Sequence, residues 1–199
     1  MDATAEPLTI IACGALAREI LAVCKANRLD HVELRCLPAI LHNHPERIVP
    51  RVREAIRDVR VRREGRILIA YGDCGTGGAL EALVQGEEGV EMLPGAHCYA
   101  FFEGVDRFHE RAEVDAFYLT DFLANHFESF VVAPLKLREH PELREMMFAN
   151  YRSVVHLEQV EAASTRASAA TAAAFLELPL ERRQTGYGDL EVALVRGAA

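Results

Sequence analysis

The chain has 199 residues, of which half are apolar and about a quarter are charged. This composition is typical of a soluble globular protein and excludes a disordered tail, a collagen-like repeat and a small disulfide-rich scaffold. Thirty acidic residues against 22 basic ones give a formal net charge of -8. We therefore expect no nucleic-acid partner. No apolar run reaches the length of a membrane span, so we expect no membrane partner either.

In the first half of the chain, short apolar runs alternate with amphipathic stretches. Apolar or alternating runs predict strands, at 8–12, 32–36, 67–71 and 90–93. Helices are predicted after the first strand, from Glu46 onward and after the glycine-rich segment 72–78. Residues 41–45 are predicted to form a loop, because Pro45 disfavours a helical conformation at His44.

The second half of the chain also alternates between predicted strands and predicted helices. Strands are predicted at 130–133, 154–157 and 180–185. Helices are predicted from His140 and Pro141, over 162–175, and after 186–189.

Strands that alternate with helices predict an α/β fold, with a mostly parallel sheet, helices on both faces and Rossmann-like layers. No linker rich in Pro, Gly or Ser interrupts the chain, so we predict a single domain over 1–199. Within it, two halves of βαβ type would cover about 1–115 and 116–199. Long apolar helices in such a small domain are compatible with a homodimer.

The N-terminal stretch has no basic region ahead of its apolar residues, so it is a poor signal peptide. A cytoplasmic location follows as an expectation, and thiols stay reduced there. Cys24 and Cys36 lie on apolar faces of a predicted helix and strand, which favours a role in core packing.

Three other cysteines share a different setting. Cys13, Cys74 and Cys98 each follow a predicted strand and precede a predicted helix. The carboxyl ends of parallel strands form the ligand crevice of an open sheet. If the three strands are neighbours, the three thiols meet at one edge, where helix N-termini favour the thiolate.

Four interpretations of this pattern stay open. Zinc would take three sulfurs, with His97, His42 or a water as the fourth ligand. A 4Fe-4S cluster would take the three cysteines and leave one iron open. Without a metal, one low-pKa cysteine would serve as a nucleophile. The plainest alternative is that these thiols are ordinary buried residues.

The loop around Cys74 carries further candidates. Asp73 is either a general base or a helix cap. Gly72 and Gly75 belong to a glycine-rich turn whose backbone N–H groups would cradle an anionic cofactor. His42, in a loop after a predicted strand, is a second catalytic candidate.

Several motifs resemble a prokaryotic family catalogued as domain of unknown function 1638. They are Ala12-Cys13-Gly14, Leu41-His42-Asn43, Tyr71-Gly72-Asp73-Cys74-Gly75, Ala96-His97-Cys98, Phe117-Tyr118-Leu119-Thr120 and Gly186-Tyr187-Gly188-Asp189-Leu190. The resemblance implies that Cys13, Cys74 and Cys98 belong to the family's shared motifs. It also implies a link to corrinoid-dependent methyl transfer from methylated amines, with a corrinoid or methyltransferase protein as partner.

The leading hypothesis is a cytoplasmic metal-binding enzyme that acts on a small molecule in methyl-group or one-carbon metabolism. Its centre would be zinc, or alternatively a 4Fe-4S cluster, held by Cys13, Cys74, Cys98 and His97. The rival hypotheses are a non-catalytic accessory protein that delivers a metal or cofactor, and a metal-free enzyme with a cysteine nucleophile.

Overall fold

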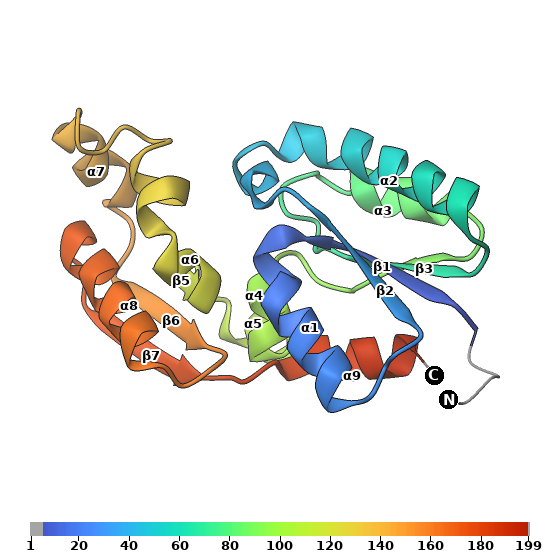
Figure 1. Cartoon of the computed structure of the whole chain (residues 1–199). Helices are drawn as coiled ribbons and strands as arrows, with labels where there is room; N and C mark the ends of the chain where they lie inside the picture. The colour runs from blue at the N-terminus through green and yellow to red at the C-terminus, as the bar shows by residue number, and fades with distance from the viewer. Residues whose placement is uncertain (1–5, 199) are drawn as a thin grey trace. The chain divides into compact units, whose positions relative to one another are not determined.

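A computed structural model describes residues 6–198, and these residues form two compact units (Figure 1). Within the described range, unit 1 comprises 6–101 and 187–198, and unit 2 comprises 102–186. Each unit contains its own sheet, and all strand pairs are parallel. The predicted α/β class is therefore confirmed, with two parallel sheets. The units do not coincide with the predicted halves, because the last helix returns to unit 1.

Unit 1 contains a four-stranded sheet. Its strands are β1 (Leu8–Cys13), β2 (Val32–Leu37), β3 (Arg66–Ala70) and β4 (Val90–Met92). They lie in the order β2-β1-β3-β4. The chain moves from β1 outward to β2 and then crosses to β3 on the other side of β1. This reversal is the switch point at which open α/β sheets bind ligands, outside the carboxyl ends of their strands.

Helices cover both faces of this sheet (Figure 1). They are α1 (Ala17–Ala26) and α9 (Gly188–Gly197) on one face, and α2 (Ile48–Arg62) and α3 (Ala79–Gln85) on the other. The predicted inward face of α2 is confirmed, since Ile48, Val52, Ala55, Ile56 and Val59 are all buried. These side chains pack with Ile11, Ile67 and Ile69 of the strands into one core.

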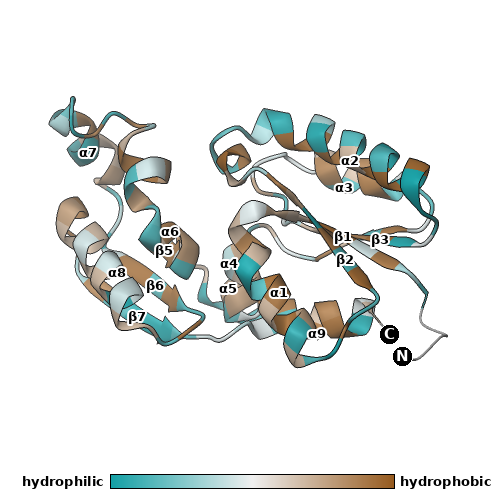
Figure 2. Cartoon of the chain, viewed as in Figure 1, coloured by the Kyte–Doolittle hydropathy of each residue, from teal (hydrophilic) through white to brown (hydrophobic). Residues whose placement is uncertain are grey.

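Unit 2 contains a three-stranded sheet. Its strands are β5 (Ala116–Thr120), β6 (Ser153–Glu158) and β7 (Leu180–Gln184), in the order β5-β6-β7. Its helices are α5 (Val105–Arg111), α6 (Asp121–Asn125), α7 (Pro141–Phe148) and α8 (Ala163–Leu176). Helix α4 (Cys98–Glu103) spans the boundary between the two units. Apolar side chains of α6, α8, β5 and β6 form part of the core. The polar strand β7 stands out in teal in Figure 2.

Two segments differ from the sequence prediction. Residues 130–133 were predicted as a strand, but the chain there forms a π-helix, η4 (Glu128–Val132). A short apolar run does not distinguish a buried strand from a buried helical turn, and the strand of this region is β5. The predicted loop around residue 42 forms two 3-10 turns, η2 (Ala39–Asn43) and η3 (Pro45–Arg47).

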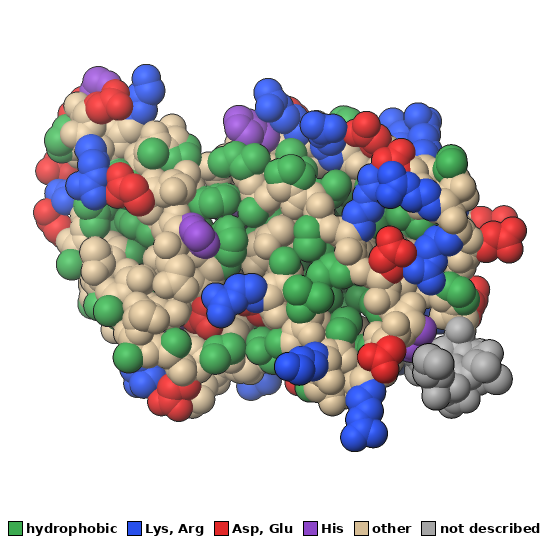
Figure 3. Space-filling view, in the orientation of Figure 1, with side chains coloured by type: hydrophobic (Ala, Val, Ile, Leu, Met, Phe, Trp, Pro, Cys, Tyr) green, Lys and Arg blue, Asp and Glu red, His purple; other side chains and the backbone are tan. Residues whose placement is uncertain are grey.

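The arginines of α2 belong to a solvated surface with mixed charge. Arg51 pairs with Glu54 at 2.9 Å, and Arg60 pairs with Glu87 at 2.7 Å. Lys and Arg side chains lie among Asp and Glu side chains on the face shown in Figure 3. Over residues 6–198, no helix is long and apolar enough to cross a membrane.

Candidate functional site

Three cysteines lie at the carboxyl ends of three adjacent strands. Cys13 is the last residue of β1, Cys74 lies in the loop after β3, and Cys98 begins α4 after β4. Because β1, β3 and β4 are neighbours and parallel, their ends share one edge of the sheet. We expected the three thiols to meet at one edge if their strands were neighbours, and in the structure the strands are neighbours.

Backbone hydrogen bonds tie the loop of Cys74 to the loop that leads into Cys98. The amide of Asp73 donates to the carbonyl of Gly95 at 3.0 Å, and the amide of Cys74 donates to that of Ala96 at 2.8 Å. The two loops thus continue the pairing of β3 and β4 beyond the ends of the strands.

Gly72 makes this close approach possible. A Cβ atom at Gly72 would lie 2.9 Å from the carbonyl oxygen of Gly95 and 2.9 Å from the amide of His97. Any side chain there would push the two loops apart. The structure thus gives Gly72 a packing role, and the cofactor-binding roles of Gly72 and Gly75 stay predictions.

The three thiols influence each other's ionisation. Burial raises the pKa of Cys98 well above its ordinary value, and Cys74 and Cys13 raise it further. Burial and the nearby Cys13 raise the pKa of Cys74 to about 11. The pKa of Cys13 is also raised, chiefly by burial. Burial and the like charge of neighbouring thiolates both disfavour the ionised form of these thiols.

Backbone groups partly oppose these shifts. Hydrogen bonds from the backbone of Ala15 lower the pKa of Cys13, and those from Gly72 and Cys98 lower the pKa of Cys74. Backbone donors of this kind stabilise sulfur ligands in metal centres and tune their potentials.

Cys74 has an unusual backbone conformation. Its φ is 48°, in the left-handed region that residues with a Cβ rarely occupy. Strain of this kind is found at functional sites more often than elsewhere. The flanking Gly75, with a φ of 82°, adopts the same region without a steric cost.

The Asp73 carboxylate organises its own loop. It accepts hydrogen bonds from the hydroxyl of Thr76 at 2.7 Å and from the amides of Gly77 at 3.1 Å and Gly78 at 2.7 Å. These bonds, led by that of Gly78, lower the pKa of Asp73, so its carboxylate is a weaker base than usual. They also occupy amides that an anion would need. The geometry matches the capping alternative, and a general-base role for Asp73 stays a prediction.

Two histidines approach the same edge. His42 lies in η2, after β2, and His97 lies in the loop before α4. Both are exposed. The surrounding protein lowers the pKa of His42, and the nearby His97 lowers it further, so the two rings are neighbours. The roles of His97 as a ligand and of His42 in catalysis stay predictions.

The three thiols lie at the same edge of the sheet, but they do not form a preformed metal-binding site. Between residues 6 and 198, no group of three or more His, Cys, Asp and Glu side chains has a geometry that would hold a metal ion. Bringing three sulfurs onto one ion would require their side chains to turn toward a common point.

Tyr71 is a site residue that the sequence analysis did not select. Its side chain is 2% exposed, and its hydroxyl is buried without a hydrogen-bond partner. Burial raises its pKa, followed by the effects of Cys13 and Cys74. A tyrosine at the end of a buried apolar strand, just before Gly-Asp-Cys, was the signal available in the sequence.

The two remaining cysteines have different surroundings. Cys24 on α1 is half-buried, whereas Cys36 on β2 is exposed. The expectation that Cys36 packs in the core is wrong, because β2 is an edge strand of its sheet. Cys36 pairs with Ala12 in the register of β1 and β2. The strand pleat therefore turns Cys36 toward the face opposite that of Cys13.

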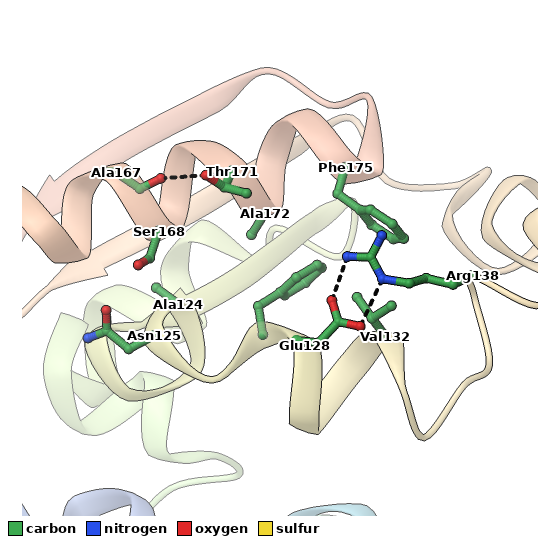
Figure 4. A pocket seen from close by; sticks show the side chains of 11 residues that line it. Ala124, Asn125, Glu128, Val132, Arg138, Ala167, Ser168, Thr171, Ala172 and Phe175 are labelled. Atoms are coloured by element: carbon green, nitrogen blue, oxygen red, sulfur yellow. Dashed lines mark hydrogen bonds and ion pairs between the residues drawn. The ribbon is translucent and has the colours of Figure 1, made fainter.

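A hollow of about 340 Å³ lies in unit 2, between the π-helix and α8 (Figure 4). The Glu128 carboxylate at its rim accepts two hydrogen bonds from Arg138. The hydroxyls of Ser168 and Thr171 donate to backbone carbonyls of their own helix. These polar groups are already satisfied within the chain, unlike the hydroxyl of Tyr71.

Comparison with known proteins identifies a family but no characterised relative. No curated protein and no solved structure matches the chain significantly. A family model matches residues 36–194, a range that includes Cys74 and Cys98 and begins after Cys13. Since this range covers most of the chain, the protein belongs to the family described as protein of unknown function (DUF1638).

Proposed function

We propose that the carboxyl edge of the unit 1 sheet binds a thiophilic metal centre through Cys13, Cys74 and Cys98, and that the protein uses this centre to act on a small molecule. The observation that best supports the proposal is the convergence of three cysteines from the ends of three adjacent parallel strands. Ligands of open α/β proteins bind at this edge.

The raised thiol pKa values favour a metal over a metal-free nucleophile. A nucleophilic cysteine needs a lowered pKa, whereas the pKa of Cys74 is raised to about 11 and those of its two neighbours are also raised. A bound cation reverses this situation, because it deprotonates the thiols that coordinate it. Three adjacent thiols that ionise poorly alone are therefore better suited to a metal.

Zinc is the centre we prefer. It takes thiolate and imidazole ligands, and a site with three protein ligands keeps one position open for a substrate or a water. His97, directly before Cys98, would close the site as a fourth ligand. A 4Fe-4S cluster with three cysteines is the alternative centre, and it would also leave one iron open.

Zinc in an open site acts as a Lewis acid or lowers the pKa of a bound thiol or water. The chain's own contribution would be to fix the sulfurs on a rigid sheet edge. Backbone donors at Ala15, Gly72 and Cys98 would stabilise the thiolates. The methyl-group chemistry, the corrinoid or methyltransferase partner and a homodimer stay predictions. A cytoplasmic location belongs to the proposal too, because it would keep the five free cysteines reduced.

The second candidate is an accessory protein that carries the metal to another enzyme. A delivery site must be accessible to its partner protein. His42 and His97 are exposed neighbours at the same edge of the sheet, and this exposure favours the second candidate. This candidate predicts a bound metal that passes to an added acceptor protein.

Metal analysis of purified protein tests the proposal. The protein is stripped with a chelator under anaerobic conditions and reloaded either with Zn²⁺ or with ferrous iron and sulfide. About one zinc per chain, without colour, supports the zinc centre, and a brown sample with about four irons supports the cluster. A protein that retains neither metal, but has one rapidly alkylated thiol, would overturn the proposal in favour of a cysteine nucleophile.

A further inference from the structure

The hollow of unit 2 has the size and the wall of a small-molecule site (Figure 4). Its volume of about 340 Å³ lies within the range of such sites. One wall is the π-helix η4, and π-helical turns occur frequently at functional sites. The other wall is α8, where Ala167 and Ala172 are too small to fill the space, and the rings of Phe127 and Phe175 supply apolar contact surface. A small molecule with an apolar body therefore suits the hollow.

Arg138 shows which charged group the rim of the hollow accepts. Its guanidinium donates two hydrogen bonds to the Glu128 carboxylate, from Nε at 2.9 Å and from Nη2 at 2.7 Å. The same guanidinium lies over the ring of Phe175, 5.2 Å from the ring centre. A carboxylate and an aromatic face together bind a planar organic cation. The side chain of Arg138 thus holds the position that a cationic ligand would take.

The pair of Glu128 and Arg138 opens at low cost. The two side chains are 55% and 64% exposed, and exposed ion pairs contribute little to stability. Arg138 belongs to a turn, so its side chain can leave the carboxylate without unwinding a helix. Arg138 holds the pKa of Glu128 below its ordinary value, and the carboxylate is charged at neutral pH. A ligand cation can therefore take the place of the guanidinium.

The other polar atoms of the hollow are mainly acceptors. The hydroxyls of Ser168 and Thr171 donate their protons to carbonyls of their own helix, and the amide of Asn125 also donates within the chain. These groups offer a ligand mainly the lone pairs of their oxygens. A ligand that donates hydrogen bonds suits them. A carboxylate or phosphate would instead be repelled by Glu128 and would compete with it for Arg138.

We propose that this hollow binds a small molecule that carries a guanidinium or amidinium group on an apolar body. The planar cation of the ligand replaces the guanidinium of Arg138 on the Glu128 carboxylate and over the ring of Phe175. Its body lies against Phe127 and the alanines of α8. Arg138 is then a competitor, built into the chain, that covers the site when no ligand is bound. The site lies within unit 2 and does not depend on the thiols of unit 1.

Benzamidine tests the site on the full chain, because its amidinium donates two parallel hydrogen bonds and its ring is apolar. Titrations followed by NMR measure the affinity. We expect benzamidine to bind, and benzoate, which has a similar shape and the opposite charge, not to bind. Glu128→Gln should lower the affinity for benzamidine at least about tenfold, because it removes a charged acceptor. Arg138→Gln should raise it up to about fivefold, because the competing exposed pair is lost.

Two substitutions on α8 separate the hollow from the rest of the surface. Ala167→Leu fills the hollow and should lower the affinity at least about tenfold. Ala170→Leu is the matched control, at an exposed position of the same helix outside the hollow, and should leave the affinity unchanged. The proposal is overturned if neither the unaltered protein nor Arg138→Gln binds benzamidine, or if benzoate binds equally well. Full affinity in Glu128→Gln or in Ala167→Leu, or a lower affinity in Arg138→Gln, would also overturn it.

Discussion

The carboxyl edges of the two sheets carry polar groups in two contrasting arrangements. In unit 2, His156 is 0% exposed, and its Nε2 lies 2.8 Å from the carboxylate of Asp121. The same carboxylate accepts hydrogen bonds from the amides of Gln159 and Val160. Glu158, which is 1% exposed, accepts two hydrogen bonds from Arg166.

Unit 1 presents the opposite case. Burial raises the pKa values of Cys13, Cys74 and Cys98, and nearby ionisable groups raise them further: Cys36 for Cys13, Cys13 and Asp73 for Cys74, and Cys74 and Cys13 for Cys98. The Tyr71 hydroxyl has no hydrogen-bond partner. One buried polar atom at the edge of the unit 2 sheet also has no hydrogen-bond partner, namely the Nδ1 atom of His156. The carboxylates at this edge, however, are satisfied by the chain itself, which indicates a structural role. The thiols of unit 1 are better suited to a ligand.

The largest expected effect comes from Cys74→Ser. A neutral hydroxyl is a poor replacement for a thiolate, so zinc affinity should fall by more than about 100-fold. Elemental analysis of the reloaded variant measures the loss. Cys24→Ala is the control, with full metal content and a stability cost of about 1 kcal/mol. Full zinc content in Cys74→Ser would remove Cys74 from the centre.

Asp121→Ala should affect the other edge. It removes the carboxylate from buried His156 and from two backbone amides. We expect a loss of about 2–4 kcal/mol in unfolding free energy, because the substitution leaves hydrogen-bonding groups of the chain without their acceptor, with metal content unchanged in the folded protein. Urea denaturation measures the first quantity. A loss below about 1 kcal/mol would show that the pairing in unit 2 contributes little.

The two edges should also respond to pH in different ways. Since Cys74 has its pKa raised to about 11, binding zinc at neutral pH must release protons. Zinc affinity should therefore rise with pH, by up to about tenfold per pH unit for each thiol that deprotonates. Competition titrations between pH 6 and 8, roughly where thiols are protonated, test the slope. A flat profile would argue against thiolate ligands.

Acid should weaken unit 2. The hydrogen bonds from Arg166 hold the pKa of Glu158 below its ordinary value of 4.5. A carboxyl whose folded pKa is lowered stabilises the fold above its unfolded pKa, and this stabilisation is lost as the pH falls through the folded pKa. Glu158→Gln should therefore be less stable at neutral pH and less sensitive to acid below about pH 4.5. Thermal unfolding across this range is the measurement, and an unaltered pH dependence would contradict it.

The smallest effect is expected for Asp73→Ala. The variant loses three hydrogen bonds within an exposed loop, so we expect a stability loss of about 1 kcal/mol. Thermal unfolding measures it, with Asp73→Asn as a control that keeps one acceptor oxygen. If the variant is as stable as the unaltered protein, Asp73 does not organise the loop. The alternative interpretation of Asp73 as a general base would then be favoured.

Much of the fold could be predicted because its elements have clear periodicity. The apolar face of α2 and the buried runs of β1 and β3 follow the helical and strand patterns directly. The strand β5 was missed, and residues 130–133 were misassigned, because short apolar runs have no decisive period. The division into two sheets depends on which strands pair, and local patterns do not contain that information.

The candidate site could be predicted in outline. Cysteines at strand ends, combined with the geometry of parallel sheets, led to Cys13, Cys74 and Cys98. The order of the strands, which brings these ends together, appears only in the structure. The same holds for the hydrogen bonds of Asp73 and for the unpaired hydroxyl of Tyr71, because both depend on side-chain directions that the sequence does not fix.

X-ray absorption spectroscopy of the zinc-loaded protein would test the central claim most directly, since it counts the sulfur atoms around the metal. The account predicts three sulfurs at about 2.3 Å, with one fewer in each of Cys13→Ser, Cys74→Ser and Cys98→Ser. A first shell of nitrogen and oxygen alone, or a sulfur count unchanged by all three substitutions, would contradict it.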